Sequence, residues 1–319
     1  MEHSLRPTRG QSRRATLSPL NRSILLLVIT MTIWGSTFVV TKELIAELPP
    51  FAIAFARVAI GALVLAPFAV VRHRREARLP WRALTLLALI GVAFYYIVFN
   101  LALKHTSAVQ GALVQSSIPA ATALVAVLWL REYASVMRWL GIALSIVGVL
   151  IVFSGSAADS SQNALLGNLL MFASVLSWGV YTSLAKRVAG FDAVVVTACI
   201  MGIGAAMLAP IAAYEFIGSG APTLSAKGWV ELIYLGAMAS GAAYMLYNDA
   251  LKHMDASQAG AYTNLIPIVG VITGVAVLGE TLTLRAVIGG VVVMIGVWIA
   301  GRDGSVLGRR PVHAGENPS

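Results

Sequence analysis

Long runs of apolar residues, separated by short polar segments, follow one another along almost the whole chain. About 20 apolar residues are enough to cross the hydrocarbon layer of a membrane as a helix. The alternation with a period of two that is typical of a membrane barrel is absent from the runs. The pattern therefore predicts an all-α integral membrane protein with ten transmembrane helices. The ten runs are residues 23–41, 51–71, 83–103, 106–130, 138–155, 165–185, 193–216, 228–247, 254–278 and 284–301.

The sequence also repeats itself. Residues 100–120 read NLALKHTSAVQGALVQSSIPA, and residues 248–268 read NDALKHMDASQAGAYTNLIPI, at a constant offset of 148 residues (248 − 100). Upstream of this phrase the offset shrinks to 144 residues (178 − 34), so that each copy of the repeat covers five of the predicted spans. Matching pairs outside the phrase are Tyr96 and Tyr244, Glu132 and Glu280, Trp34 and Trp178, and Lys42 and Lys186.

Five spans is an odd number, so the second copy must enter the membrane from the opposite face. We therefore predict two inverted five-helix repeats, residues 22–155 and 165–302, around a central cavity. A basic cytoplasmic tail (1–21), a periplasmic linker (156–164) and a second cytoplasmic tail (303–319) complete the predicted organisation. Inverted repeats give secondary transporters two related states, each open to one side of the membrane.

The distribution of positive charge predicts the orientation. Most of the 23 Lys and Arg residues fall on one side of the predicted spans, including those of the N-terminal tail and of the segment 72–82. Because basic loops stay in the cytoplasm, this bias predicts a multi-pass protein of the cell inner membrane with both termini cytoplasmic. The tail carries no small-residue cleavage site, so we do not interpret it as a signal peptide.

Composition excludes several other classes of protein. Hydrophobic residues make up 58% of the 319 residues and charged residues only 12%, about half the charged fraction of a soluble domain. The single cysteine, Cys199, excludes a disulfide framework, and P-loop and hydrolase motifs are missing. The net charge of +9 forms no basic patch interleaved with aromatic residues, so nucleic acid is not an expected partner. We expect no enzymatic activity, no cofactor and no metal site.

Motifs in both halves point to a known family. They are WGSTFVVTK at 34–42, FARVAIGAL at 55–63, and the SSIP and NLIP segments with their LREY and LGETL endings. Together they resemble the EamA-type family of the drug/metabolite transporter superfamily over residues 22–302. The resemblance implies a ten-helix transporter of small metabolites, often amino acids, with a cavity between the halves. The second half departs from the motif with WGVYTSLAK and lacks an arginine matching Arg57.

Polar and aromatic residues near the middle of the predicted spans are candidates for the lining of this cavity. A polar side chain that faces lipid is costly, so these residues should face the interior. Aromatic rings with polar tips suit amphipathic metabolites. The alternative for each residue is a hydrogen bond that holds two packed helices together. The candidates are Trp34, Ser36, Tyr96, Gln115, Ser116, Trp178, Tyr181, Tyr244, Tyr262, Thr263 and Asn264.

Three further residues carry separate hypotheses. Arg57 is the one ionisable residue well inside a predicted span, and it could contact a substrate anion. The preferred interpretation is nevertheless structural: snorkelling, or a bond to neighbouring carbonyls. Pro119 and Pro267 each remove a backbone donor and are expected to kink a span, which supplies either a hinge or a static bend.

Residues at the ends of the spans complete the set. Lys42, Lys186, Glu132 and Glu280 are helix-end charges, and we expect the two glutamates to cap a helix or to pair with a nearby arginine. Gating or proton transfer by the glutamates is the alternative. Glycines seven residues apart in 138–155 and in 284–301 predict close helix packing or a homodimer through these two helices.

The sequence thus predicts a secondary transporter that moves small metabolites, amino acids or similar compounds, across the lipid bilayer by alternating access. Because Asp and Glu lie at or near the span ends, facilitated export is preferred and proton antiport is the alternative. A lipid or carrier-lipid flippase or scramblase, and a sugar or nucleoside permease on the same fold, stay open. An ion channel is disfavoured because rings of charged residues are missing.

Overall fold

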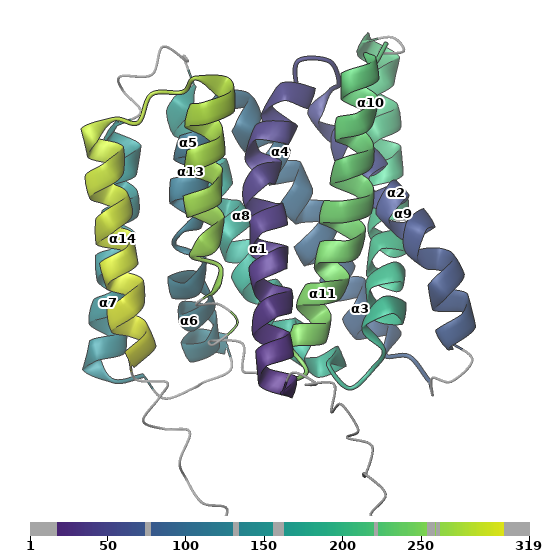
Figure 1. The fold of residues 1–319 in the computed structure, drawn as a ribbon, viewed down its shortest axis with the longest axis horizontal. Coiled ribbons are helices and arrows are strands. Elements are labelled where there is room, and N and C mark those ends of the chain that lie inside the picture. The colour runs from purple at the N-terminus through teal and green to yellow at the C-terminus, as the bar shows by residue number, and fades with distance from the viewer. Residues whose placement is uncertain are drawn as a thin grey trace, which may run out of the picture.

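The computed structural model describes residues 18–73, 78–129, 134–155, 163–219, 223–253, 259 and 262–302. These residues form helices and no strands, and most of the helices stand side by side along one direction (Figure 1). Nine helical segments of this part of the chain are long and apolar enough to cross a membrane, and Leu265–Leu278 is a shorter apolar helix.

Helices of the first half follow the predicted spans closely. The third and fourth spans each consist of more than one helical segment, because a π-helical stretch and a two-residue turn interrupt them. The elements are α1 (Pro19–Leu44), α2 (Pro50–His73), α3 (Trp81–Ala88), the π-helical η1 (Leu89–Phe94), α4 (Tyr95–His105), α5 (Ala108–Gln115), α6 (Ile118–Trp129) and α7 (Val136–Gly155).

The second half is built in the same way. It too has a π-helical stretch in its third span, and a turn precedes the proline of its fourth span. Its elements are α8 (Ala164–Ala185), the 3₁₀ turn η3 (Lys186–Val188), α9 (Ala193–Ser219), α10 (Ala226–Ile233), the π-helical η4 (Tyr234–Ala242), α11 (Ala243–Ala250), α13 (Leu265–Leu278) and α14 (Leu284–Arg302).

Helix starts carry the expected local signals. Ser18, Ser107 and Ser225 precede α1, α5 and α10, and each accepts a hydrogen bond on its hydroxyl oxygen from a backbone N–H of the first turn. Serine at this position satisfies one of the N–H groups that a helix start leaves without a partner. Such caps fix where each of these helices begins, because they supply a partner for an N–H group of the first turn.

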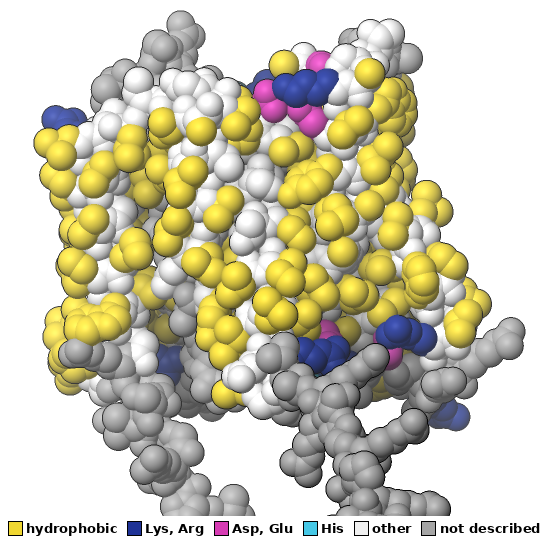
Figure 2. All heavy atoms as spheres, viewed as in Figure 1, with side chains coloured by type: hydrophobic (Ala, Val, Ile, Leu, Met, Phe, Trp, Pro, Cys, Tyr) yellow, Lys and Arg dark blue, Asp and Glu magenta, His cyan; other side chains and the backbone are white. Residues whose placement is uncertain are grey.

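The outer surface has the polarity of a membrane protein. On the face shown in Figure 2, apolar side chains cover the middle, and Lys, Arg, Asp and Glu side chains gather at the two ends. At one end Lys227 forms an ion pair with Glu43, and at the other Arg22 pairs with Asp249. Exposed apolar area of this extent is stable when lipid covers it. The chain is therefore a multi-pass membrane protein.

The first helices of the two halves run in opposite directions. Lys42, near the end of α1, contacts the end of α4 through the carbonyl oxygens of Leu103 and Thr106. A Cβ atom on Gly167, near the start of α8, would lie 2.8 Å from the backbone nitrogen of Thr106. The start of α8 therefore lies at the same end of the molecule as the end of α1.

Glycines join α7 and α14 within one chain. A Cβ atom on Gly141 would lie 2.5 Å from the carbonyl oxygen of Gly296, and one on Gly148 would lie 2.8 Å from that of Gly289. The two helices stand together at one edge of the molecule (Figure 1). The glycine-bearing faces are thus occupied by each other, and the predicted homodimer would need the outer faces of these helices.

The two predicted proline kinks take the form of interruptions. Ser116 and Ser117 form a turn between α5 and α6, and Pro119 is the second residue of α6. Pro267 is the third residue of α13. A proline in the first turn of a helix needs no hydrogen-bond donor, because the N–H groups there have no partner within the helix. The interruption lies in the turn before each proline, where a proline removes the hydrogen bond to the carbonyl four residues earlier.

Candidate functional site

Aromatic rings from α1, α8 and α11 meet at the centre of the molecule. The ring of Trp34 lies 4.9 Å from that of Trp178 and 5.3 Å from those of Tyr244 and Tyr247, measured between centroids. Trp178 also stacks on Tyr181 at 4.8 Å. Edge-to-face and stacked pairs at these distances attract each other beyond the burial of their area. We call these five rings the central cluster.

A second group of rings comes from α4 and α1. Tyr95 stacks on Phe99 with a centroid distance of 5.6 Å, and Phe99 meets Phe38 edge to face at 5.3 Å. Tyr95 and Tyr96 follow directly after the π-helical η1. Tyr95 also lies 5.5 Å from Trp178, so that the second group continues into the central cluster.

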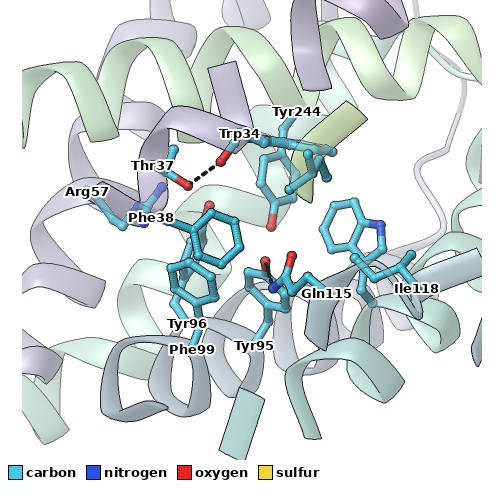
Figure 3. A pocket seen from close by; sticks show the side chains of 12 residues that line it. Trp34, Thr37, Phe38, Arg57, Tyr95, Tyr96, Phe99, Gln115, Ile118 and Tyr244 are labelled. Atoms are coloured by element: carbon cyan, nitrogen blue, oxygen red, sulfur yellow. Dashed lines mark hydrogen bonds between the residues drawn. The ribbon is translucent and has the colours of Figure 1, made fainter. Parts of the chain in front are cut away.

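A pocket lies between the two groups of rings (Figure 3). Figure 3 shows the side chains of Tyr95, Gln115 and Tyr244 pointing toward the same space. Most of the lining comes from the first half of the chain. The lining residues are Trp34, Thr37, Phe38, Arg57, Tyr95, Tyr96, Phe99, Gln115, Ile118, Trp178, Tyr244 and Ile266.

Arg57 brings a positive charge to this pocket from α2. Its side chain is 1% exposed, so it is buried within the protein instead of snorkelling to the membrane surface. The Nε atom donates a hydrogen bond to Ser240 Oγ at 3.1 Å, and the guanidinium carbon lies 4.2 Å from the centre of the Tyr96 ring. Its Nη1 atom has no hydrogen-bond partner among the described residues.

Gln115 is the polar residue on the opposite side of the pocket. Its Nε2 atom donates to the Tyr95 hydroxyl at 3.0 Å and lies 3.3 Å from Ser174 Oγ. These contacts orient the amide and the Tyr95 ring together. The pocket therefore combines aromatic walls with a cation at one edge and an amide at another.

The two π-helical stretches hold the pocket residues in place. A π-helical stretch interrupts the regular hydrogen-bond ladder of an α-helix. In η1, Ile90 O accepts from Ser177 Oγ at 2.6 Å and Gly91 O accepts from the Tyr244 hydroxyl at 2.9 Å. In η4, Ala239 O accepts from Trp34 Nε1 at 3.0 Å. Each of these bonds joins the first half of the chain to the second.

Five of the eleven predicted cavity residues line the pocket, and a sixth lies directly behind it. Tyr181 stacks behind Trp178, and its hydroxyl donates to Asn248 Oδ1 at 3.1 Å. The five are Trp34, Tyr96, Gln115, Trp178 and Tyr244.

The other five predicted residues do not line this pocket. Ser36 Oγ contacts the Tyr234 hydroxyl at 2.6 Å, and Ser116 Oγ donates to the Leu113 carbonyl of its own helix. These two serines therefore hold helices together or satisfy their own backbone. The remaining three, Tyr262, Thr263 and Asn264, lie in the segment just before α13.

The two predicted helix-end lysines make the same contact in the two halves. Lys42 Nζ donates to Leu103 O at 2.6 Å, and Lys186 Nζ donates to Leu251 O at 2.9 Å. Leu103 and Leu251 are equivalent residues of the repeated phrase. A lysine at the end of a helix satisfies carbonyl oxygens that lack a partner and suits the negative end of the helix dipole.

Glu280 binds the start of a helix from the other half. Its carboxylate accepts hydrogen bonds from the backbone nitrogen atoms of Ala108 at 2.8 Å and Val109 at 2.7 Å, in the first turn of α5. The neighbouring Arg285 donates to the backbone of Ser154. A carboxylate at a helix start is favoured by the dipole and by the free N–H groups. Glu132, the predicted counterpart of Glu280, lies outside the described residues.

Six lining residues were not among the sequence candidates: Thr37, Phe38, Tyr95, Phe99, Ile118 and Ile266. Helical spacing could have found three of them. Thr37 and Phe38 are three and four positions after Trp34, and Phe99 is three after Tyr96, so they share a helix face with predicted residues. Tyr95 adjoins Tyr96, and no periodicity signals that both would reach the pocket.

Comparisons with known proteins agree on one family. The sequence profile described as "EamA-like transporter family" matches residues 21–154 and, separately, residues 165–302. The chain is 30% identical over 287 residues to an uncharacterized transporter of Archaeoglobus fulgidus, covering 88% of this chain and 97% of the relative. It is 27% identical to the uncharacterized transporter YyaM of Bacillus subtilis, covering 88% and 93%. A protein of known crystal structure, 20% identical, superposes with a TM-score of 0.64 over 92% of this chain and 100% of its own, which shows a shared fold.

Proposed function

This chain belongs to the EamA-like transporter family, and on that premise we propose that it exports small metabolites, amino acids or amino-acid-like compounds, by alternating access. The observation that carries the proposal is the pocket at the centre of the molecule, whose lining comes from both halves. Its aromatic walls suit the apolar part of such a compound, and Arg57 and Gln115 supply polar contacts.

The proposed mechanism uses two inverted five-helix repeats. The opposite directions of α1 and α8, and the shared contacts of Lys42 and Lys186, support this arrangement. Two halves of the same fold that enter from opposite faces can exchange an outward-open state for an inward-open one by rocking against each other. The turns before Pro119 and Pro267 are the proposed hinges.

We further propose that the chain crosses the inner membrane ten times with both termini in the cytoplasm. The helix Leu265–Leu278 would form the last part of the span predicted at 254–278, of which residues 254–258 and 260–261 lie outside the described residues. The start of α1 and the end of α14 lie at the same end of the molecule (Figure 1), as an even number of crossings requires. Arg22 and Arg72 lie at that end and support the cytoplasmic assignment.

Counterflow in sealed liposomes tests the function. The purified full-length protein, with an unlabelled amino acid inside, is expected to accumulate the labelled compound transiently and saturably. Facilitated export predicts that the rate does not change when a pH gradient is imposed. If the pH gradient alone drives uphill transport, the mechanism is proton antiport and not facilitated export.

A matched pair of tyrosine variants ties the exchange to the pocket. Tyr95→Leu removes a lining ring, and Tyr214→Leu removes a ring that is 79% exposed on the outside of α9. We expect the first variant to lose exchange and the second to keep it at equal amounts of folded protein. Exchange of lipids, sugars or nucleosides in place of every amino acid would overturn the proposed substrate class.

A further inference from the structure

Arg57 differs from the other charges of the molecule because it is buried and one of its nitrogen atoms is unused. Among the described residues no hydrogen-bond acceptor contacts Nη1, and no carboxylate forms an ion pair with this side chain. A buried charge without a partner is costly. A guanidinium kept in such a place indicates a negatively charged group that arrives with a ligand.

The surroundings hold the guanidinium ready for such a group. Ser240 fixes Nε, and the Tyr96 ring supports the guanidinium plane. Here α2 and η4 pack closely, since a Cβ atom on Gly61 would lie 3.1 Å from the carbonyl oxygen of Gly236. Figure 3 shows the guanidinium at the edge of the pocket beside Phe38 and Tyr96. A planar guanidinium with free N–H donors matches the geometry of a carboxylate.

The same pocket has no carboxylate that would form an ion pair with an amino group. None of its twelve lining residues is an Asp or a Glu. Gln115 directs its amide nitrogen at Tyr95 and Ser174, and the charge of Arg57 repels an ammonium group nearby. Binding an amino acid therefore gains from its carboxylate and from its apolar side chain, and gains no ion pair from its ammonium group.

Building on the proposed transport function, we propose that the pocket binds small organic anions that combine one carboxylate with one apolar or aromatic group. Arg57 binds the carboxylate, and the central cluster and the α4 rings take the apolar group. An amino group is not required. The substrate class is thus wider than amino acids and includes their deaminated relatives.

Four probes that share a phenyl group separate the contributions. They are 3-phenylpropionate, phenylalanine, 3-phenylpropionamide and 3-phenylpropylamine, and their binding to the detergent-purified protein is measured by titration calorimetry. We expect the two carboxylates to bind within about threefold of each other, and the amide and the amine to bind about tenfold or more weakly. Amide or amine binding as tight as that of the acid would overturn the inference. So would phenylalanine binding more than about tenfold tighter than 3-phenylpropionate.

Variants assign the effect to Arg57. Arg57→Gln is expected to weaken binding of 3-phenylpropionate by about 30-fold and to leave the amide unchanged, because it removes one side of a buried charge pair. Arg57→Lys should bind 3-phenylpropionate with an affinity between those of the unchanged protein and Arg57→Gln. Lysine keeps the charge but loses the paired N–H donors of the guanidinium. Arg72→Gln is the control, because this arginine of the same helix has a side chain that is 53% exposed. Equal weakening of acid and amide would make Arg57 a structural residue.

Two further measurements keep the inference testable. If Arg57→Gln does not fold, Ser240→Ala can be used, because it removes the hydrogen-bond partner of Arg57 Nε. It should weaken binding of 3-phenylpropionate severalfold and leave binding of 3-phenylpropionamide unchanged. Unchanged binding of 3-phenylpropionate would count against the inference. Counterflow of labelled 3-phenylpropionate then separates the two proposals. Selective binding of 3-phenylpropionate without exchange would overturn the transport proposal alone. Exchange of amino acids, together with equal binding of the acid and the amide, would overturn this inference alone.

Discussion

Arg57 in α2 and Ile200 in α9 occupy corresponding places in the two halves of the chain. Arg57 lies ten residues before Pro67, and Ile200 lies ten residues before Pro210. Both side chains are buried. The first half places a cation there, and the second half places a hydrocarbon side chain.

Several polar side chains of the second half are bonded to one another. In the second half Asn248 bonds to Thr197 at 3.0 Å and to Tyr181 at 3.1 Å, and Thr182 bonds to Tyr247 at 3.0 Å. These groups satisfy one another within the second half. The helix-end lysines, in contrast, make the same contact in both halves. The comparison teaches that the two halves share the lysine contact at the helix ends, whereas the charged residue of the pocket comes from the first half.

The strongest way to break this comparison is to give the second half a charge. Ile200→Arg would bury a cation among apolar neighbours, and we expect a loss of about 4–5 kcal/mol or more in the free energy of unfolding. Ile200→Met, which nearly conserves volume, should cost less than about 1.5 kcal/mol. Thermal unfolding and the monodisperse fraction in detergent measure both. A stable Ile200→Arg protein would mean that the second half tolerates a cation as the first does.

Trp34 belongs to the part of the site that both halves share. Trp34→Ala removes three ring contacts and the bond to Ala239. We expect a loss of about 3–5 kcal/mol and of substrate exchange. Trp298→Ala, at an indole that is 58% exposed on α14, should leave both unchanged. Equal exchange rates of the two variants, at equal amounts of folded protein, would mean that the central cluster does not bind the substrate.

A glycine pair tests the close contact between the halves at η1. A Cβ atom on Gly91 would overlap the ring of Tyr181, whereas one on Gly202 in α9 would meet no atom within 4 Å. Gly91→Ala should therefore cost about 1–3 kcal/mol, and Gly202→Ala should stabilise the helix by about 0.5–1 kcal/mol. Unfolding midpoints of the two variants give the comparison. Equal midpoints would show that Tyr181 moves aside freely.

The smallest expected effect concerns the contact that the halves have in common. Lys42→Met and Lys186→Met each remove a lysine from a helix end, and we expect losses of about 1–2 kcal/mol that resemble each other. The unfolding midpoint of each variant is the measurement. A large loss for one variant and none for the other would mean that the repeated phrase is structural in only one half.

The positions of the spans could be predicted because a membrane requires about 20 consecutive apolar residues, and a sequence shows such runs directly. The π-helical stretches could not, because the residues 89–94, LIGVAF, are apolar like their neighbours. In η1 the carbonyl oxygens of Ile90 and Gly91 accept hydrogen bonds from Ser177 and Tyr244 of the other half. Contacts of this kind have no signature within the segment.

The site was accessible from the sequence where residue size decided the outcome. Large aromatic residues such as Trp34 and Trp178 at mid-depth had to pack somewhere, and they pack at the centre. Short polar residues such as Ser36 and Ser116 were less predictable, since a hydroxyl can bond to a carbonyl of its own helix. Burial of Arg57 depends on which side of α2 faces η4, and a single sequence does not reveal that.

The lone charge of Arg57 has an electrical consequence. On the proposed mechanism, an empty carrier holds a positive charge in its pocket, and a carrier loaded with a carboxylate that has no amino group holds none. A cytoplasm-negative membrane voltage is worth about 2.3 kcal/mol per elementary charge per 100 mV across the full membrane. When the empty pocket opens to the cytoplasm, its charge feels the negative potential there and is stabilised. The resting voltage would thus draw the unloaded protein back toward the cytoplasm after each delivery, which favours outward transport of the anion without any coupled ion.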